Sequence, residues 1–283
     1  MPPRSAPSLI LLLFAACPSA CLAQANGPTR WQHPWGRFQP GAWKLVRVVT
    51  ETFDGQAAMS SVSETRTTVR EVGVDSVTLM VEVAVQLGGK EFGAEPQMIR
   101  QGFHGETATP DLTTKDLGLG EVTIEKQNLK IPCRIEQLEY HSAAGKTVTR
   151  IYYSDSVEPY VLRRETTRVN PGSTAPAAQT IVRVVDLDVP YQVLNTRLHT
   201  AKIEAVHKDA AATTTTISLN SMQVPGGVVC HNSKVVDNQG RLIGCSTLEL
   251  IDYGLTPDDH HGGLFPRLRA GHPLRLFRFP SRE

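Results

Sequence analysis

The fold of this chain is decided by the stretch CRIEQLEYHSAAGKTVTRIYYSDSVEPYVLRRETTRV, residues 133–169. A related stretch, residues 201–236, reads AKIEAVHKDAAATTTTISLNSMQVPGGVVCHNSKVV. When the two are aligned, Arg134-Ile135-Glu136 falls on Lys202-Ile203-Glu204. Self-similarity at a fixed spacing indicates duplicated supersecondary units. We therefore predict two copies of one unit, each made of long strands with polar turns and a Pro-containing corner.

The residues before the duplicated region also have a strand pattern. In Val77–Leu87 every second residue is Val or Leu, while Glu82 and Gln86 fall on the other face. Side chains alternate along a strand, so this pattern predicts a strand with one buried face. Gly88-Gly89 after it predicts a hairpin turn, and residues 106–120 predict a loop with at most one helical turn. The sequence thus predicts an all-β fold of long antiparallel hairpins with an internal duplication, forming a large twisted sheet or an open or half barrel.

The N-terminus has the composition of an export signal. Arg4 supplies a positive charge, Leu9–Ala16 is a short apolar run, and Ala23-Gln24-Ala25 fits the small-x-small cleavage pattern. An apolar run this short cannot span a bilayer, which needs about 20 residues. A second possibility is that lipid is attached at Cys17, which follows Phe14-Ala15-Ala16 and resembles a lipoprotein box. That form would be membrane-anchored, whereas the other is free in the periplasm or secreted.

The rest of the chain divides by composition. A formal net charge of +1 gives no global attraction to nucleic acid or to an anionic membrane. The region 26–132 begins with an arm that holds all three tryptophans, Trp31, Trp35 and Trp43. We expect these indoles to seal one end of the sheet, with a platform for a sugar or lipid as the alternative. We predict these regions: signal peptide 1–25, β region 26–132, duplicated region 133–253 with copies at about 133–188 and 201–253 and continuous with 26–132, and a flexible basic tail 254–283.

Three segments resemble a family of uncharacterised exported bacterial β-rich proteins. They are HPWGRFQPGAWKLVRVVTETFDG, the SETRTT arm, and VPGGVVCHNSKVVDNQGRLIGCSTLELIDYG. The resemblance runs from about His33 to Tyr253 and brings no established activity. More remotely, long antiparallel arms with Pro corners in an exported chain resemble lipoprotein-carrier-like half-barrels, which hold acyl chains in an apolar concavity. That resemblance implies an apolar ligand inside a curved sheet.

The sequence contains no standard catalytic signature, such as a nucleophile elbow, a zinc-protease helix or a phosphate-binding loop. Asp258-Asp259-His260-His261 is the densest set of potential metal ligands, but its flanking Gly and Pro residues favour a solvated loop. Cys230-His231 cannot form a dyad, because adjacent strand residues point to opposite faces. We assign no catalytic, cofactor-binding or metal-binding residue and no cofactor. The rows of Glu and Arg are best explained as cross-strand ion pairs rather than as an anion site: Glu64, Arg66, Arg70, Arg163, Arg164 and Glu165.

Cys230 and Cys245 form a possible structural pair. They flank the predicted turn Asp237–Gly240. A two-residue turn at Asp237-Asn238 would place them directly opposite, within disulfide range, whereas a longer loop would separate them. The sequence leaves both arrangements open.

Three functions remain open. The first is a non-enzymatic envelope protein that acts as a binding or structural module. The second is a carrier of a lipid or another apolar ligand in a β half-barrel. The third is a hydrolase of unrecognised type. A carrier needs an apolar concavity that is open to solvent, and a hydrolase needs titratable side chains that converge in a cleft. The expected partners are an apolar ligand or an envelope protein, with no nucleic acid and with a membrane only if Cys17 is lipidated.

Overall fold

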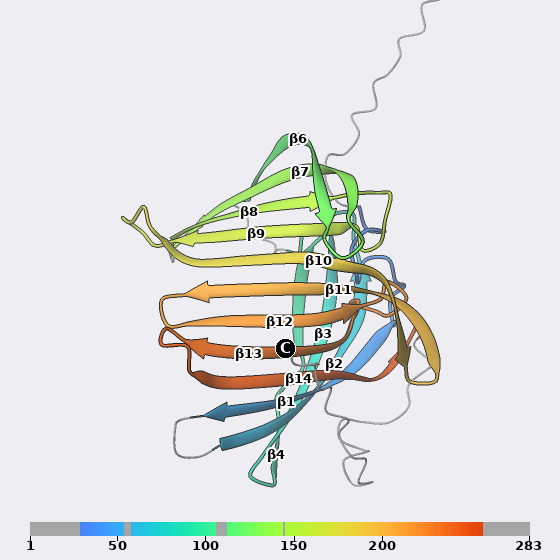
Figure 1. The fold of residues 1–283 in the computed structure, drawn as a ribbon. Coiled ribbons are helices and arrows are strands. Elements are labelled where there is room, and N and C mark those ends of the chain that lie inside the picture. Colours follow the sequence, from blue (N-terminus) through green and yellow to red (C-terminus); the bar gives the residue numbers. More distant parts are fainter. Residues whose placement is uncertain (1–28, 54–57, 106–111, 144, 257–283) are drawn as a thin grey trace, which may run out of the picture.

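The computed structural model describes residues 29–53, 58–105, 112–143 and 145–256. These residues form one antiparallel sheet without any helix, so the predicted all-β fold is confirmed (Figure 1). The predicted leader with Cys17, and the potential metal ligands Asp258–His261, lie outside the described residues. The strands are β1 Trp43–Phe53, β2 Ala58–Val72, β3 Ser76–Leu87, β4 Lys90–Gly93, β5 Gln97–Gly102, β6 Thr113–Ile124, β7 Leu129–Ser142, β8 Gly145–Tyr153, β9 Val161–Val169, β10 Pro176–Val193, β11 Thr196–Asp209, β12 Ala212–Asn220, β13 Val228–Asp237 and β14 Leu242–Gly254.

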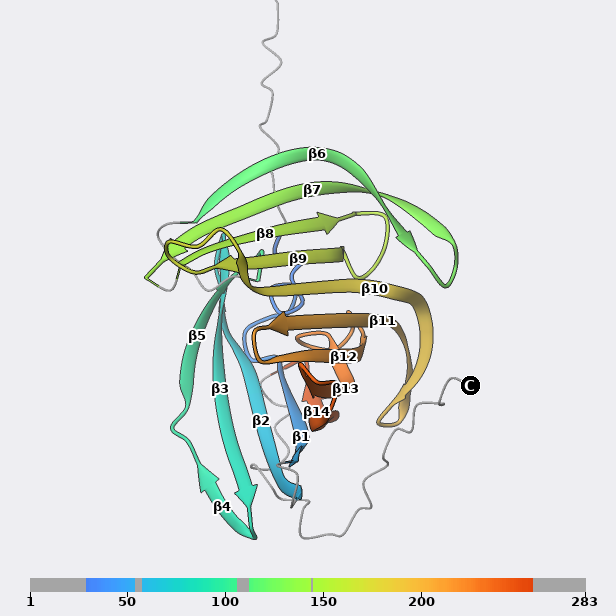
Figure 2. The same cartoon turned by 60° about the vertical axis from the view of Figure 1, so that its left-hand side comes forward.

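Neighbouring strands of the sheet are mostly consecutive in the chain, and the exception is the pairing of the N-terminal strand β1 with the C-terminal strand β14. Strands β6 to β14 pair in chain order, β1 then pairs with β14, and β2 and β3 follow, with β4 and β5 both paired to β3. In Figure 2, β2, β3 and β5 run steeply on one side while β6 to β10 cross above them. The sheet is therefore an open half-barrel, one of the predicted forms. The first predicted copy covers β7 to β10 and the second β11 to β14, while the duplication itself stays a prediction.

Strand register assigns each side chain to one of two faces. An unbroken row of opposed residues runs from Glu136 in β7 to Leu87 in β3. On this face, Oε2 of Glu136 lies 3.0 Å from Nε2 of His104, which follows β5 at the other end of the sheet. Side chains from the two ends of the sheet meet here, so this is the concave face. The remaining face is convex.

Residues 29–42, which we call the cap, close one end of the half-barrel. Trp35 is 8% exposed and packs with Val69 and Val77 on the concave face. The backbone N–H of Gly226 donates to the carbonyl of Pro34 at 2.9 Å, which joins the cap to the β12–β13 loop. The predicted sealing role is confirmed for Trp35, whereas Trp31 is 56% exposed.

The predicted loop at 106–120 is wrong for residues 113–120, which belong to β6. This strand lies at the edge of the sheet and pairs only with β7. The register shifts between Asp116 and Gly118, where Gly118 has φ +90° and its N–H donates to Oδ1 of Asp116 at 2.7 Å. An edge strand tolerates such a bulge, so turn-forming residues do not end it. The predicted Gly88-Gly89 turn is confirmed, with positive φ at both residues.

The sheet has small packed clusters in place of one central core. Four hydrophobic clusters occur in the described part of the chain, and they lie at the cap, under β6 and β7, and along the bent β10–β11 hairpin. Every residue of β12 is half-buried, on both faces. In β3, Val77 is fully buried, but Val81, Val83 and Val85 on the same face are only half-buried. The concave face is therefore filled at the cap and accessible further along the strands.

Candidate ligand-binding site

The central part of the concave face of the middle strands is free of strong charge, and acidic residues on this face occur only at strand ends, at Asp209 and Asp237. Register places three consecutive inward positions of each strand from β10 to β14 on it, and none is Lys, Arg, Asp or Glu. We call this face, together with the concave side of β1 to β3, the trough. The fifteen positions are Ala178, Thr180, Val182, Ile203, Ala205, His207, Thr214, Thr216, Ser218, His231, Ser233, Val235, Ser246, Leu248 and Leu250.

The convex face of the same strands carries the charges. Arg183 of β10 pairs with Glu204 of β11 at 2.7 Å, and Arg163 pairs with Glu165 within β9 at 2.5 Å. In the predicted rows of Glu and Arg, Glu64 pairs across strands with Arg47, as expected. Arg163 and Glu165 pair within β9 rather than across strands, and Arg164 donates to the backbone carbonyl of His104. These ion pairs thus lie on the convex side, whereas the fifteen concave positions are uncharged. Other convex pairs are Arg47–Glu64 at 2.7 Å and Lys146–Glu139.

Three hydroxyls of the trough have side-chain partners on the neighbouring strand. The hydroxyls of Thr216 and Ser233 lie 2.9 Å apart, and that of Thr180 lies 2.8 Å from Nδ1 of His207. A buried hydroxyl without a partner is costly, whereas a paired one is not. These polar residues can therefore be covered by an apolar ligand without the loss of a hydrogen bond.

Apolar side chains line one wall of the trough. Val81, Val83 and Val85 project inward from β3, and Leu248 projects from β14. All of them are half-buried, so part of their surface contacts water in the absence of a ligand. Covering apolar surface contributes about 25 cal/mol per Å². The wall can bind a chain through contact area alone.

Lys44 lies at the capped end of the trough. Its neighbours on the concave face are Thr67 of β2 and Tyr253 of β14, and its Nζ lies 5.2 Å from the centre of the Trp35 ring. The residue is 9% exposed, and burial lowers its pKa from 10.5 to about 8. Among the described residues, Nζ has no hydrogen bond and no carboxylate partner. At neutral pH it is a buried, largely protonated ammonium group.

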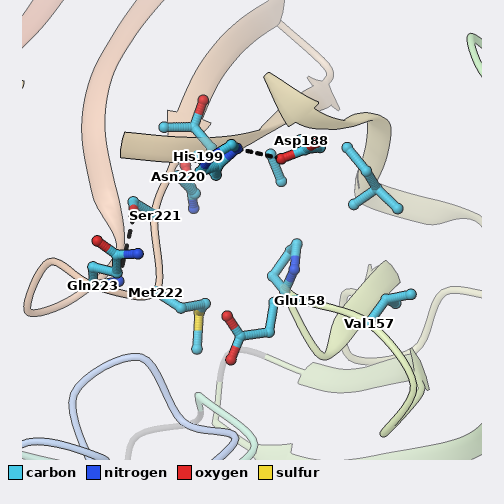
Figure 3. A pocket seen from close by; sticks show the side chains of 12 residues that line it. Val157, Glu158, Asp188, His199, Asn220, Ser221, Met222 and Gln223 are labelled. Atoms are coloured by element: carbon cyan, nitrogen blue, oxygen red, sulfur yellow. Dashed lines mark hydrogen bonds and ion pairs between the residues drawn. The ribbon is translucent and has the colours of Figure 1, made fainter. Parts of the chain in front are cut away.

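A separate cavity of about 300 Å³ opens near the same end of the sheet (Figure 3). It lies between the β8–β9 loop, the bend of the β10–β11 hairpin and the β12–β13 loop. Asp188 and His199 form an ion pair at 2.5 Å on one side, with Glu158 across from them. Oδ1 of Asn220, which also lines the cavity, is buried and has no hydrogen-bond partner in the described structure.

The cavity groups titratable side chains, but their surroundings do not activate them. The side chains of His199 and Asp188 are 72% and 76% exposed, so water solvates both. Ser221 is 1% exposed, and its hydroxyl accepts the backbone N–H of Gln223 at 3.3 Å. A nucleophile needs contact with a base, and no hydrogen bond joins Ser221 to His199. The hydrolase hypothesis therefore gains no support from this cavity.

The structure separates the cysteine and histidine residues that the sequence singled out. Cys230 lies opposite Glu249, and its neighbour His231 lies opposite Leu248 on the other face. Cys245 lies opposite Lys234, because the longer of the two possible loops joins β13 to β14. Cys230 and Cys245 are free thiols. Within the described ranges, no group of three metal-binding side chains comes together.

Two features of the site were missed by sequence reasoning. The neutral trough depends on strand register across the whole sheet, which the sequence does not display. Lys44 did carry a local signal, because alternation in β1 places it beside Val46 and Val48 on an otherwise uncharged face. A single lysine on an apolar strand face is the pattern that could have identified it.

Comparison with known proteins adds little to this description. No protein-family model matches the chain, and no curated protein matches it. One similar solved structure is an exported protein with a YmcC-like fold from Bacteroides fragilis, with a TM-score of 0.30, 10% identity, and coverage of 76% of this chain and 97% of that chain. Another is an outer membrane lipoprotein-sorting protein domain from Vibrio parahaemolyticus, with a TM-score of 0.27, 8% identity, and coverage of 75% and 84%. TM-scores this low support no functional assignment. No helix that could cross a membrane occurs among the residues described.

Proposed function

We propose that this protein is an extracytoplasmic, non-enzymatic carrier that holds an apolar chain in its trough. The observation that carries the proposal is the division of strands β10 to β14 into a convex face that carries ion pairs and a central concave part without charged side chains. An apolar ligand accounts for this division, because burial of an unpaired charge beneath it is costly.

Packing supports the same function. The cap closes one end of the trough with Trp35, while Val81, Val83 and Val85 stay half-buried further along. An apolar surface that is accessible to water and backed by a rigid sheet can bind a chain without rearrangement. The paired hydroxyls of the trough remain satisfied when the chain covers them.

Binding is tested with N-phenyl-1-naphthylamine, a neutral probe that fluoresces in apolar surroundings. The mature chain should give saturable binding, and a single-chain lipid should displace the probe. Thr216→Glu places a carboxylate on the concave side of β12 and should weaken binding at least tenfold. Thr215→Glu is the matched control, because the side chain of Thr215 points to the convex face, where it lies opposite Lys234.

The comparison of the two variants shows whether the probe binds on the concave face of the sheet or elsewhere. Equal binding by both variants, at equal melting temperatures, would place the probe elsewhere on the surface. The absence of saturable binding by the unmodified protein would refute the carrier function and leave the structural or partner-binding module. In that case capture of an envelope protein becomes the next experiment.

The extracytoplasmic location rests on the leader. Leu9–Ala16 and Ala23-Gln24-Ala25 support export and cleavage, and Cys17 supports lipid anchoring as the alternative. Intact mass measurement of the protein from a bacterial envelope fraction separates the two. A chain that begins at residue 26 is free, a diacylated chain that begins at Cys17 is anchored, and an uncleaved chain in the cytoplasm contradicts both.

A further inference from the structure

Lys44 is the charged residue of the trough, and its neighbours on the concave face are uncharged. It lies on the concave face, is about nine-tenths buried, and is surrounded by Val46, Thr67 and Tyr253. Desolvation of an ammonium group is unfavourable unless a counter-charge or hydrogen bonds offset it. The contact with the Trp35 ring at 5.2 Å is the only interaction of Nζ among the described residues.

We propose that the ligand is a single-chain amphiphile with an anionic oxygen headgroup, and that Lys44 receives this headgroup at the capped end of the trough. The proposal rests on the carrier function proposed above and specifies its substrate class. The shared chemistry is a carboxylate or phosphate oxygen that accepts hydrogen bonds from Nζ. Such charge-assisted hydrogen bonds are about twice as strong as neutral ones.

The dimensions and the surroundings agree with this placement. From Lys44 to Thr52, β1 extends about 26 Å at the usual rise of a strand. An extended palmitoyl chain fits within that length, with its headgroup at the cap and its tail toward the hairpins at the open end. Lys44 keeps 9% of its surface exposed, so the residue is not wholly enclosed.

The burial of Lys44 also favours an anion over a neutral group. Its lowered pKa, about 8, reflects an environment without a compensating negative charge. A bound carboxylate or phosphate supplies that charge and raises the pKa of Lys44 again. A neutral headgroup can accept one hydrogen bond but leaves the charge uncompensated. A cationic headgroup would be repelled.

The experiment compares ligands of equal chain length in the probe-displacement assay at pH 7. Palmitate, hexadecanol and hexadecyltrimethylammonium differ in headgroup charge, and palmitoyl-lysophosphatidylglycerol carries the anion as a phosphate. We expect at least tenfold tighter binding of an anionic ligand than of hexadecanol, and the weakest binding for the cation. Tighter binding of palmitate than of the lysophospholipid identifies a carboxylate site, and the reverse order identifies a phosphate site.

Substitutions of Lys44 test whether this residue causes the preference for an anionic headgroup. Lys44→Met should abolish the preference of the protein for palmitate over hexadecanol, whereas Lys44→Arg should retain the preference for the anion. Equal binding of palmitate and hexadecanol by the unmodified protein overturns the headgroup proposal but not the carrier function. A failure of all four ligands to bind refutes the carrier function itself. A preference for palmitate that survives in Lys44→Met places the headgroup elsewhere.

Discussion

Replacement of Lys44 by methionine should stabilise the ligand-free protein, although the substitution removes headgroup selection. In the folded protein the pKa of Lys44 falls from 10.5 to about 8 because the side chain is buried. Each pKa unit corresponds to about 1.4 kcal/mol, so the charged form destabilises the fold by about 3 kcal/mol at pH 7. Methionine has a similar length and no charge, so it retains the packing against Trp35 and removes this cost.

The measurement is urea unfolding of the ligand-free protein and of Lys44→Met as a function of pH. Below pH 8 the full difference should be present, and it corresponds to about 6–12 °C in Tm for a domain of this size. Between pH 8 and 10.5 the unfolded chain binds more protons than the native protein, so native stability rises with pH. The difference between the two proteins should therefore close in that window. A variant that is less stable at pH 7, or a difference that does not change up to pH 10.5, would refute the reasoning.

Three further predictions concern the cap and the cysteines. Burial and the charge of Arg164 lower the pKa of His33 from 6.5 to about 4, so the unfolded chain takes up the proton first as the pH falls. The stability of the native protein should therefore fall by about 3 kcal/mol between pH 6.5 and pH 4. His33→Gln should lose less stability than the unmodified protein in urea unfolding at pH 7 and pH 4. Gly226→Ala should destabilise the protein by more than about 1 kcal/mol, because φ is +72° and a Cβ there would lie 2.4 Å from the Trp35 ring. Gly240→Ala, in an open turn with φ +79°, controls for backbone strain alone. Equal losses of stability in the two variants would contradict the role of the ring contact. Denatured mature protein should give three free thiols with a thiol reagent, and native protein should react first at the half-buried Cys245; one free thiol after denaturation would contradict the observed register.

The sequence was sufficient for the strands whose pattern is local. The alternation of Val and Leu in Val77–Leu87 placed β3 within one residue, and Gly88-Gly89 gave its turn. The same reasoning fails at 113–120, where turn-forming residues predict a loop but belong to β6. An edge strand has a free side that tolerates a bulge at Gly118, and a residue pattern does not say which strand is at the edge.

The cysteine pair shows a second limit. The sequence left two registers open for the β13–β14 hairpin, because both loop lengths suit the residues after Asp237. The structure selects the longer loop, in which Oδ1 of Asp237 accepts the N–H groups of Gln239 and Arg241 at 2.8 and 2.9 Å. Those hydrogen bonds decide the register and thereby separate Cys230 from Cys245. Local side-chain contacts of this kind are formed only in the folded turn.

By itself, the sequence determined that this protein is all-β, built from long antiparallel hairpins, because alternation and turn residues act over a few positions along the chain. Only the tertiary structure decided that β1 pairs with β14, that the sheet stays open, and which set of alternating residues faces inward. Those properties depend on pairing between segments far apart in the sequence and on the curvature of the whole sheet. The stretch at 133–169 and the related stretch at 201–236 supply the scaffold. The trough and its buried Lys44 exist only because the N-terminal strands complete that scaffold.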